Sequence, residues 1–485
     1  MIRLRVVLLL AMFVGLAVGL AACAPSTIYR CVPTLCSAGT DAALAAQCAR
    51  SSFQVLTPTD TAQPGYALGF IELDDQGQLW NRAQIDQTLG SVDTLTGKGA
   101  SDYLMVVFVH GWKHSAGWSR DGGCGGDGSV KHNPGGDEDS NVSNFRVALK
   151  ELSAAEADLS RKVGRPARHV VGVYVGWRGG SITTPVIEDL TFWDRKDTAH
   201  KVGHGQVTEV LERLDLLRRQ RMIRNPESLS RLVVVGHSFG GAVVFSALEQ
   251  ILEARFVDTQ SAATDPAPIE GFGNLVVLLN PAFEAQLYAP LSDLSIEQQT
   301  YAKAQLPVLA ILTSVADDAT GIAFPIGRWF STWPEKQRPM ERRNATTGKI
   351  EIIEERKADV DAVGHFDPYE THTLTATSRS PGDTPSGYSG PTPQDRVKIL
   401  AAAAKAWEDD KPGSEIIFPG SVLRRTDNSA GRNPYLNIQV DKVLIHDHDD
   451  IWRPGVREFI TSLILISSQS NNLAERAQYR QQAAE

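Results

Sequence analysis

Short runs of Val, Leu and Ile alternate along this chain with longer segments that have a helical pattern of apolar residues. Each run is short enough for a strand and apolar at consecutive positions, which is typical of a parallel strand covered on both faces. The alternation of such strands with helices predicts an α/β fold with a mostly parallel central sheet and helices on both faces. The expected strands are 103–112, 169–177, 232–236, 274–280, 307–314 and 441–445, and the expected helices are 144–164, 205–222, 239–256, 294–305 and 451–466.

The chain has 485 residues, of which 42% are hydrophobic and 22% charged, an ordinary composition for a folded protein. We expect the α/β domain to span residues 56–466 and a polar tail to follow at 467–485. The strand and helix pattern breaks down at 325–440, which predicts a large insertion before the last strand, able to act as a lid. Within it, KIEIIEE at 349–355 predicts a hairpin.

The charge of the chain argues against a nucleic-acid partner. The net charge is −9, and no long block of Lys and Arg occurs, so we expect no nucleic-acid partner. The Arg-rich stretch 213–224 is interpreted as the solvent-exposed face of a helix. The oligomeric state stays open.

The first 22 residues read as a signal peptide, with a basic start followed by an apolar stretch. The end of this segment, Leu20-Ala21-Ala22-Cys23, resembles the lipobox of bacterial lipoproteins, in which the cysteine carries the lipid. An uncleaved anchor or ordinary signal cleavage is the alternative. The resemblance implies an exported protein, lipid-anchored to the bacterial cell envelope. Since Ala24 and not Asp follows Cys23, it also implies the outer membrane.

Four cysteines remain if Cys23 carries a lipid: Cys31, Cys36, Cys48 and Cys124. Outside the cytosol, four cysteines suggest two disulfides in one of three pairings. Three of them lie in a tether expected at 23–55. A zinc site is a weaker alternative, because Cys124 stands apart in a glycine-rich loop at 117–141. The acids of this loop could bind calcium, but they lack EF-hand spacing.

One strand ends in an unusual turn. The run LVVVGHSFGG, residues 232–241, places Ser238 between Gly236 and Gly240, and a second apolar run follows at once. Gly-X-Ser-X-Gly alone is weak evidence, and the alternative is a serine N-cap in a glycine turn. A sharp strand-to-helix turn would strain the serine backbone, and only small neighbours would tolerate the crowding. We therefore predict that Ser238 is a nucleophile, with Gly236 and Gly240 forming the elbow.

A serine nucleophile needs a base, and the base needs an acid to orient it. Asp317 and Asp318 follow the strand 307–314, and we favour Asp317 as the acid. His446 and His448 follow the last strand, and we favour His448 as the base. As an alternative, His446 and His448 could bind a metal together with Asp450, although no further ligand is evident. The histidines of the insertion, His365 and His372, are expected to be structural or to face a substrate.

Developing negative charge on a substrate oxygen needs hydrogen-bond donors. The backbone N–H of Phe239, directly after the serine, is one expected donor. The second should come from the loop His110-Gly111-Trp112, with Trp112 as the donor and Gly111 allowing close approach. The alternative is an ordinary strand-ending turn.

These segments together resemble the α/β-hydrolase superfamily, in its serine esterase and lipase class. VVFVHGW, VVVGHSFGG, SVADD and HDDIW match the oxyanion, nucleophile, acid and histidine segments in sequence order, within about 66–466. FVHGWKHSA, VYVGWRGG and FWDRKDTAHKVG resemble a subgroup of bacterial and fungal hydrolases. The sequence departs from the family where Asp447 precedes the histidine and where the acid and histidine lie far apart. The resemblance implies a Ser–Asp–His acyl-transfer enzyme that needs neither metal nor cofactor.

We therefore expect an ester hydrolase that acts on ester or lipid-like small molecules at a membrane. Trp329, Phe330 and Trp333 in the insertion are a weak indication of such substrates. Protease, thioesterase, acyltransferase or amidase chemistry would use the same groups. There are two alternatives from other classes. One is a hydrolase fold without catalytic activity that serves as a scaffold in the cell envelope, and the other is a metal-dependent hydrolase.

Overall fold

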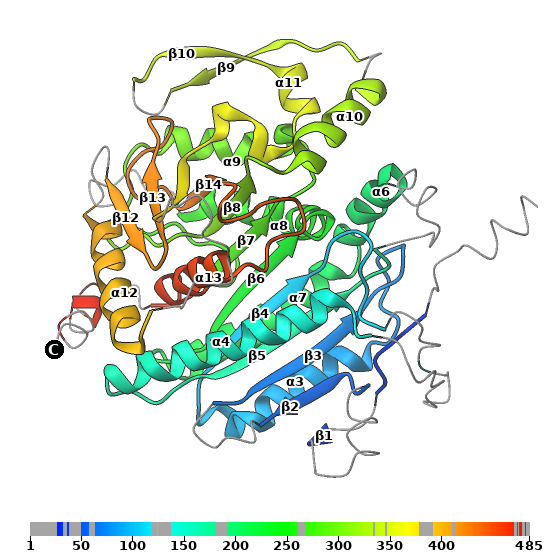
Figure 1. Ribbon diagram of the computed structural model, residues 1–485, viewed down its shortest axis with the longest axis vertical. Helices are drawn as coiled ribbons and strands as arrows, with labels where there is room; N and C mark the ends of the chain where they lie inside the picture. The colour runs from blue at the N-terminus through cyan, green and yellow to red at the C-terminus, as the bar shows by residue number, and fades with distance from the viewer. Residues whose placement is uncertain are drawn as a thin grey trace, which may run out of the picture.

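The computed structural model of the chain describes most of the expected α/β domain (Figure 1). The described residues are 27–32, 36–37, 50–57, 64–118, 124, 137–179, 192–259, 267–332, 335–344, 347–377, 391–409, 414–469, 473, 475–477 and 481. Among them, no helix is long and apolar enough to cross a membrane. The predicted signal peptide and Cys23 lie outside the described residues, as do Cys48, Trp333 and most of the glycine-rich loop.

A 12-stranded sheet in the order β1-β2-β3-β5-β4-β6-β7-β8-β14-β11-β13-β12 forms the centre of the molecule. From β3 to β11 every neighbouring pair is parallel. Antiparallel pairs occur toward the two ends, where β2 pairs with β3 and β13 pairs with β11 and β12. The predicted α/β class and mostly parallel sheet are therefore confirmed. The strands are β1 Cys36–Ser37, β2 Phe53–Leu56, β3 Tyr66–Glu72, β4 Tyr103–Val109, β5 His169–Gly176, β6 Arg231–His237, β7 Leu275–Leu279, β8 Leu309–Ser314, β11 His372–Ala376, β12 Glu415–Phe418, β13 Ser421–Arg425 and β14 Tyr435–Val440.

Helices cover both faces of the sheet, as the fully apolar strands require. Successive side chains of a strand point to opposite faces, so Met105 and Val107 of β4 join one core while Val106 and Phe108 join the other. One core is covered by α3 Ala83–Leu95, α6 Phe192–Gly203, α7 Val207–Arg224, α8 Phe239–Thr259 and α9 Ala285–Glu297. The other is covered by α4 Ser140–Lys162, α12 Pro393–Glu408 and α13 Pro454–Ser467.

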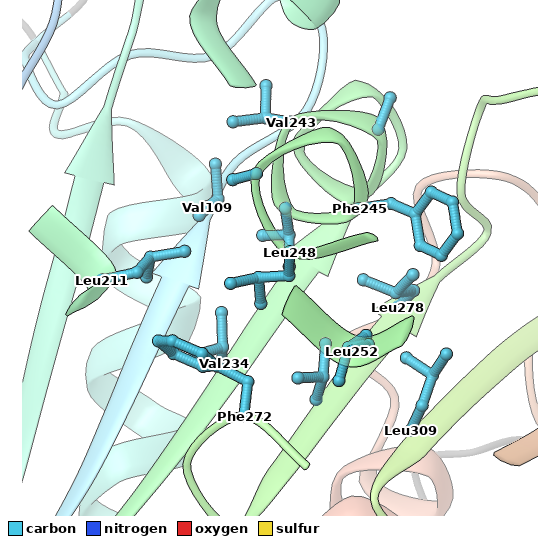
Figure 2. Close-up of a cluster of buried hydrophobic side chains, with 14 of the residues drawn as sticks. Val109, Leu211, Val234, Val243, Phe245, Leu248, Leu252, Phe272, Leu278 and Leu309 are labelled. Carbon is cyan, nitrogen blue, oxygen red and sulfur yellow. The ribbon is translucent and has the colours of Figure 1, made fainter. Parts of the chain in front are cut away.

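Helix α8 is buried on most of its circumference, since it lies against the sheet and beneath other helices. Phe245, Leu248 and Leu252 are 0 to 1% exposed and pack against side chains of β6, β7 and β8 (Figure 2). Burying an aliphatic or aromatic side chain of this size contributes about 1.5 to 3 kcal/mol. The helix that begins directly after Ser238 is thus held rigidly on the sheet.

The last parallel strand lies earlier than the sequence predicts. The prediction placed it at 441–445, whereas β14 spans Tyr435–Val440 and pairs with β8. After it, Asp441 closes a turn by accepting hydrogen bonds from the backbone N–H groups of Val443 and Leu444, at 3.0 and 2.9 Å. The segment that carries His446 and His448 is therefore a loop beyond the sheet edge.

Two further helices begin earlier than the sequence predicts. The helix expected at 294–305 is α9, Ala285–Glu297, which contains Pro290 in its interior and buries Tyr288 and Leu291 in the core. Packing outweighs the loss of one backbone donor at the proline. The helix expected to begin near 144 begins at Ser140, because Asp139 caps it through the backbone N–H of Asn141, at 2.9 Å.

The predicted insertion at 325–440 has two parts with different places in the fold. The first holds α10 Phe324–Thr332, β9 Pro339–Arg343, β10 Ile350–Glu354 and α11 Glu355–Val360. The hairpin β9–β10 confirms the prediction at 349–355, and it lies at the top of the molecule with α10 and α11 (Figure 1). The second part, from β11 to β14, extends the central sheet and belongs to the core.

The chain before the sheet is packed on the domain where it is described. Arg30 is fully buried, donates to Glu138 at 2.9 Å, and lies 3.8 Å from the centre of the Phe70 ring. Cys31 forms a disulfide with Cys124, 93 residues later, and their Cα atoms are 5.7 Å apart. One expected disulfide is thus present, and the second expected disulfide is not tested because Cys48 lies outside the described residues.

Replacing both Cys31 and Cys124 with Ser should lower the free energy of unfolding by about 2 to 4 kcal/mol, because the disulfide closes a long loop. Urea unfolding of the purified protein measures this change. The double variant treated with a reductant is the matched control, and it should lose less stability than wild-type protein treated in the same way, because it lacks this bridge. Equal stability of the oxidised protein and the double variant would contradict the bridge.

Candidate functional site

Ser238 lies at the junction of a strand and a helix in a conformation that few non-glycine residues adopt. β6 ends at His237 and α8 begins at Phe239, and Ser238 between them has φ +54°. Its backbone N–H donates to the carbonyl of Leu279 on β7 at 2.9 Å, and its carbonyl accepts from Gly241 at 2.9 Å. These bonds hold the strained turn, which is a frequent feature of functional sites.

The two glycines beside Ser238 are required by backbone crowding. A Cβ on Gly236 would lie 2.6 Å from the carbonyl oxygen of Gly240, and one on Gly240 would lie 2.1 Å from that of Val109. Any side chain at either position would displace the backbone of the turn. Gly236 and Gly240 thus allow the close backbone approach on which the turn at Ser238 depends.

Three of the sequence-predicted side chains meet at the carboxyl edge of the sheet. His448 Nε2 lies 2.7 Å from Ser238 Oγ, and His448 Nδ1 lies 2.9 Å from Asp317 Oδ1. Asp317 follows β8, and His448 lies in the loop after β14. Ser238 and Asp317 are each 2% exposed. A base thus lies within hydrogen-bond reach of a serine, and a buried acid orients the base.

The alternative acid and base are not part of this chain of hydrogen bonds. Asp318 is exposed, and His446 is exposed with its backbone N–H 3.4 Å from Asp450 Oδ2. The structure therefore brings together Asp317 and His448, and leaves Asp318 and His446 at the surface.

The hydrogen bond between Asp317 and His448 shifts both groups toward their charged forms. Burial raises the pKa of Asp317, but hydrogen bonds from His448 and Thr320 and the charge of His448 outweigh it, so the pKa is lowered. Burial lowers the pKa of His448, but the hydrogen bond and charge of Asp317 outweigh it, so the pKa is raised. The pair is arranged to stabilise a protonated imidazole.

Two buried residues that were not predicted from the sequence form hydrogen bonds with the backbone carbonyl of His448. Asn280, directly after β7, donates from Nδ2 to the carbonyl of His448 at 2.9 Å, and its Oδ1 accepts from the backbone N–H of Ser314 at 2.9 Å. His237 Nε2 lies 3.0 Å from the same carbonyl. Burial and the charge of His448 lower the pKa of His237 to about 3, so it is neutral and donates from Nε2.

The predicted oxyanion loop lies against the serine. A Cβ on Gly111 would lie 2.9 Å from Ser238 Cβ, so only glycine allows this approach. His110 is fixed by Trp177, whose backbone N–H donates to His110 Nε2 at 3.0 Å and whose indole donates to the His110 carbonyl at 2.8 Å. Trp112 is half-buried and packs against the core that includes side chains of α8.

Phe239, the other expected donor, is the first residue of α8 and is fully buried. The N-terminus of a long buried helix thus lies beside Ser238 Oγ, where its dipole favours negative charge.

The structure does not bring together the three residues that the sequence suggested as metal ligands. Within the described residues, the one group of His, Cys, Asp and Glu side chains spaced to hold a metal is His237, His448 and Asp449, rather than His446, His448 and Asp450. Both ring nitrogens of His448 are already in hydrogen bonds to Ser238 and Asp317. A metal ion bound by His448 would have to displace one of these two hydrogen bonds.

A scan against protein-family models found no match for this chain, and searches of the curated proteins and of the solved structures found none either.

Asp317→Asn should lower the pKa of His448, since the negative charge that outweighs burial is removed. Histidine ring resonances followed by NMR across pH measure the change. Asp318→Asn is the matched control, because Asp318 is exposed and lies outside the hydrogen-bond chain, and it should leave the titration of His448 unchanged. An unaltered His448 titration in Asp317→Asn would contradict the described contact.

Proposed function

We propose that this protein is a serine hydrolase of the α/β-hydrolase superfamily that cleaves carboxylic esters through an acyl-enzyme on Ser238. The observation that carries the proposal is the hydrogen-bond chain from Ser238 through His448 to Asp317 at a strained strand-to-helix turn. The chain order Ser, Asp, His and the position at the carboxyl edge of a mostly parallel sheet support the superfamily assignment.

In the proposed reaction, His448 Nε2 takes the proton of Ser238 Oγ as the oxygen attacks the ester carbonyl carbon. Asp317 stabilises the resulting imidazolium. The raised pKa of His448 supports this role, because a raised pKa means that the protonated ring is favoured. The backbone N–H groups of Phe239 and Trp112 hold the oxyanion. His448 then gives the proton to the departing alcohol, leaving the acyl group on Ser238.

Deacylation repeats these steps with water. His448 takes a proton from a water molecule, whose oxygen attacks the acyl carbon, and then returns it to Ser238 as the carboxylic acid leaves. No metal or cofactor is needed for this sequence of steps.

Exposed apolar side chains that follow the acid in the sequence support an acyl or lipid-like substrate. Ile322, Ile326 and Trp329 lie in the helical segment that follows Asp317 in the sequence and ends in α10. They are 55, 57 and 39% exposed, respectively. Exposed apolar side chains are a frequent feature of surfaces that bind apolar ligands, and this exposure is the basis for proposing an apolar acyl group.

Ser238→Ala should reduce kcat for p-nitrophenyl ester hydrolysis by about 10⁴-fold or more, because the nucleophile is lost. The assay uses soluble protein that starts after Cys23 and esters of increasing acyl length, with circular dichroism to check folding. Longer acyl chains should be preferred if the exposed face of α10 contacts them. Wild-type protein without turnover and without labelling by a fluorophosphonate would favour the silent-scaffold alternative.

We further propose that a lipid on Cys23 anchors the protein to the cell envelope, on the basis of the lipobox-like sequence. Cys23→Ala should move the full-length protein from the membrane fraction to the soluble fraction after centrifugation. Thr27→Ala, which lies outside the lipobox and leaves every cysteine in place, is a control that should stay with membranes. Unchanged sedimentation of Cys23→Ala would contradict the anchor.

A further inference from the structure

A histidine of the insertion reaches the acid of the candidate site. His365 lies in a single helical turn, Val363–His365, after α11 and before β11. This turn is fixed to the sheet, since Asn437 of β14 donates to the Val363 carbonyl at 3.0 Å and Gly364 packs directly on Thr313 of β8. The position of His365 is thus set by the core and not by the exposed hairpin.

A second hydrogen-bond chain runs from His365 to Asp317 through Thr320. The Thr320 hydroxyl contacts Asp317 Oδ2 closely and lies 2.9 Å from His365 Nε2. An ionised carboxylate only accepts, so Thr320 donates its one proton to Asp317. The hydroxyl therefore accepts from His365, which must carry its proton on Nε2.

The two oxygens of Asp317 have different partners. Oδ1 accepts from His448 and from the backbone N–H groups of Ala319 and Thr320, at 2.9, 3.1 and 3.1 Å. Within the described part of the chain, the partner of Oδ2 is the Thr320 hydroxyl. The plane of the carboxylate is thus set by His448 and backbone groups on one side and by Thr320 on the other.

We propose that Thr320 and His365 are positioning residues that hold Asp317 in the orientation that His448 needs. This inference rests on the proposed serine hydrolase function. The groups facing His365 are Asp317, His448 and Asp367, and burial lowers the pKa of His365 so that it serves as a neutral donor. The insertion is then part of the catalytic apparatus and not only a cover over it.

The matched variants at Thr320 are Val and Ser. Thr320→Val keeps the shape but removes the hydroxyl, so Asp317 Oδ2 loses a charge-assisted hydrogen bond, and kcat should fall about ten- to hundredfold with KM nearly unchanged. Thr320→Ser restores the hydroxyl and should recover most of the activity.

The matched variants at His365 are Leu and Gln. Leu removes the donor, whereas the side-chain amide of Gln can place an N–H near the position of His Nε2. His365→Leu should lower kcat about three- to tenfold, and His365→Gln should recover most of this loss.

A spectroscopic measurement separates positioning from a merely structural role. In Thr320→Val and His365→Leu, a loosened Asp317 should lower the pKa of His448 in an NMR titration, with the folded state checked by thermal unfolding. Folded variants with wild-type kcat and a wild-type His448 titration would overturn the inference. If Thr320→Val does not fold, His365→Leu still decides the question. If wild-type protein neither turns over esters nor reacts with a fluorophosphonate, the proposed function fails instead, which is a distinguishable result.

Discussion

The candidate site depends on a line of contacts that crosses the carboxyl edge of the sheet from β6 to the loop after β14. The Ser238 N–H bonds to Leu279 on β7, and the Asn280 N–H bonds to Leu312 on β8, at 2.9 and 2.8 Å. Ser314, at the end of β8, donates from its hydroxyl to the carbonyl of Ile445 at 2.6 Å. Each contact joins two neighbouring segments of the candidate site, so Ser238, Asp317 and His448 stay within hydrogen-bond distance although they are far apart in the sequence.

Burial makes this arrangement rigid and sets its electrostatics. Ser238, Asp317 and Asn280 are all at most 2% exposed, so polar groups there must be paired with one another. An unpaired carboxylate would be costly, and Asp317 is charged because His448, Thr320 and two backbone N–H groups surround it. The same low-dielectric surroundings strengthen the hold of Asp317 on the imidazole.

The sequence predicted the fold class and the buried strands because these depend on local patterns. Consecutive apolar residues at 103–109 and 232–235 are typical of strands in a sheet that is covered on both faces. The last strand was placed too late, because YLNIQV and KVLI carry similar patterns, and only pairing with β8 distinguishes them.

The part of the candidate site that could be predicted also depends on local patterns. Ser238 and Asp317 follow recognisable strands, whereas His448 was named from the segment KVLI, which resembles a strand but lies after the last strand, β14. Asn280 had a signal that was overlooked, a polar residue directly after the apolar run 275–279. His365 had none, since nothing in the local sequence indicates that its segment folds back onto Thr313 and Thr320. Contacts of this kind depend on tertiary packing.

The central claim is that Ser238 becomes covalently acylated by an ester substrate. Mixing the wild-type protein with a p-nitrophenyl ester, quenching with acid within the first turnover and mapping peptides by mass spectrometry tests it directly. The account predicts a mass increase equal to the acyl group on the peptide that contains Ser238, and its absence in Ser238→Ala. Ester turnover with no adduct on that peptide, or with the adduct on another residue, would contradict the account.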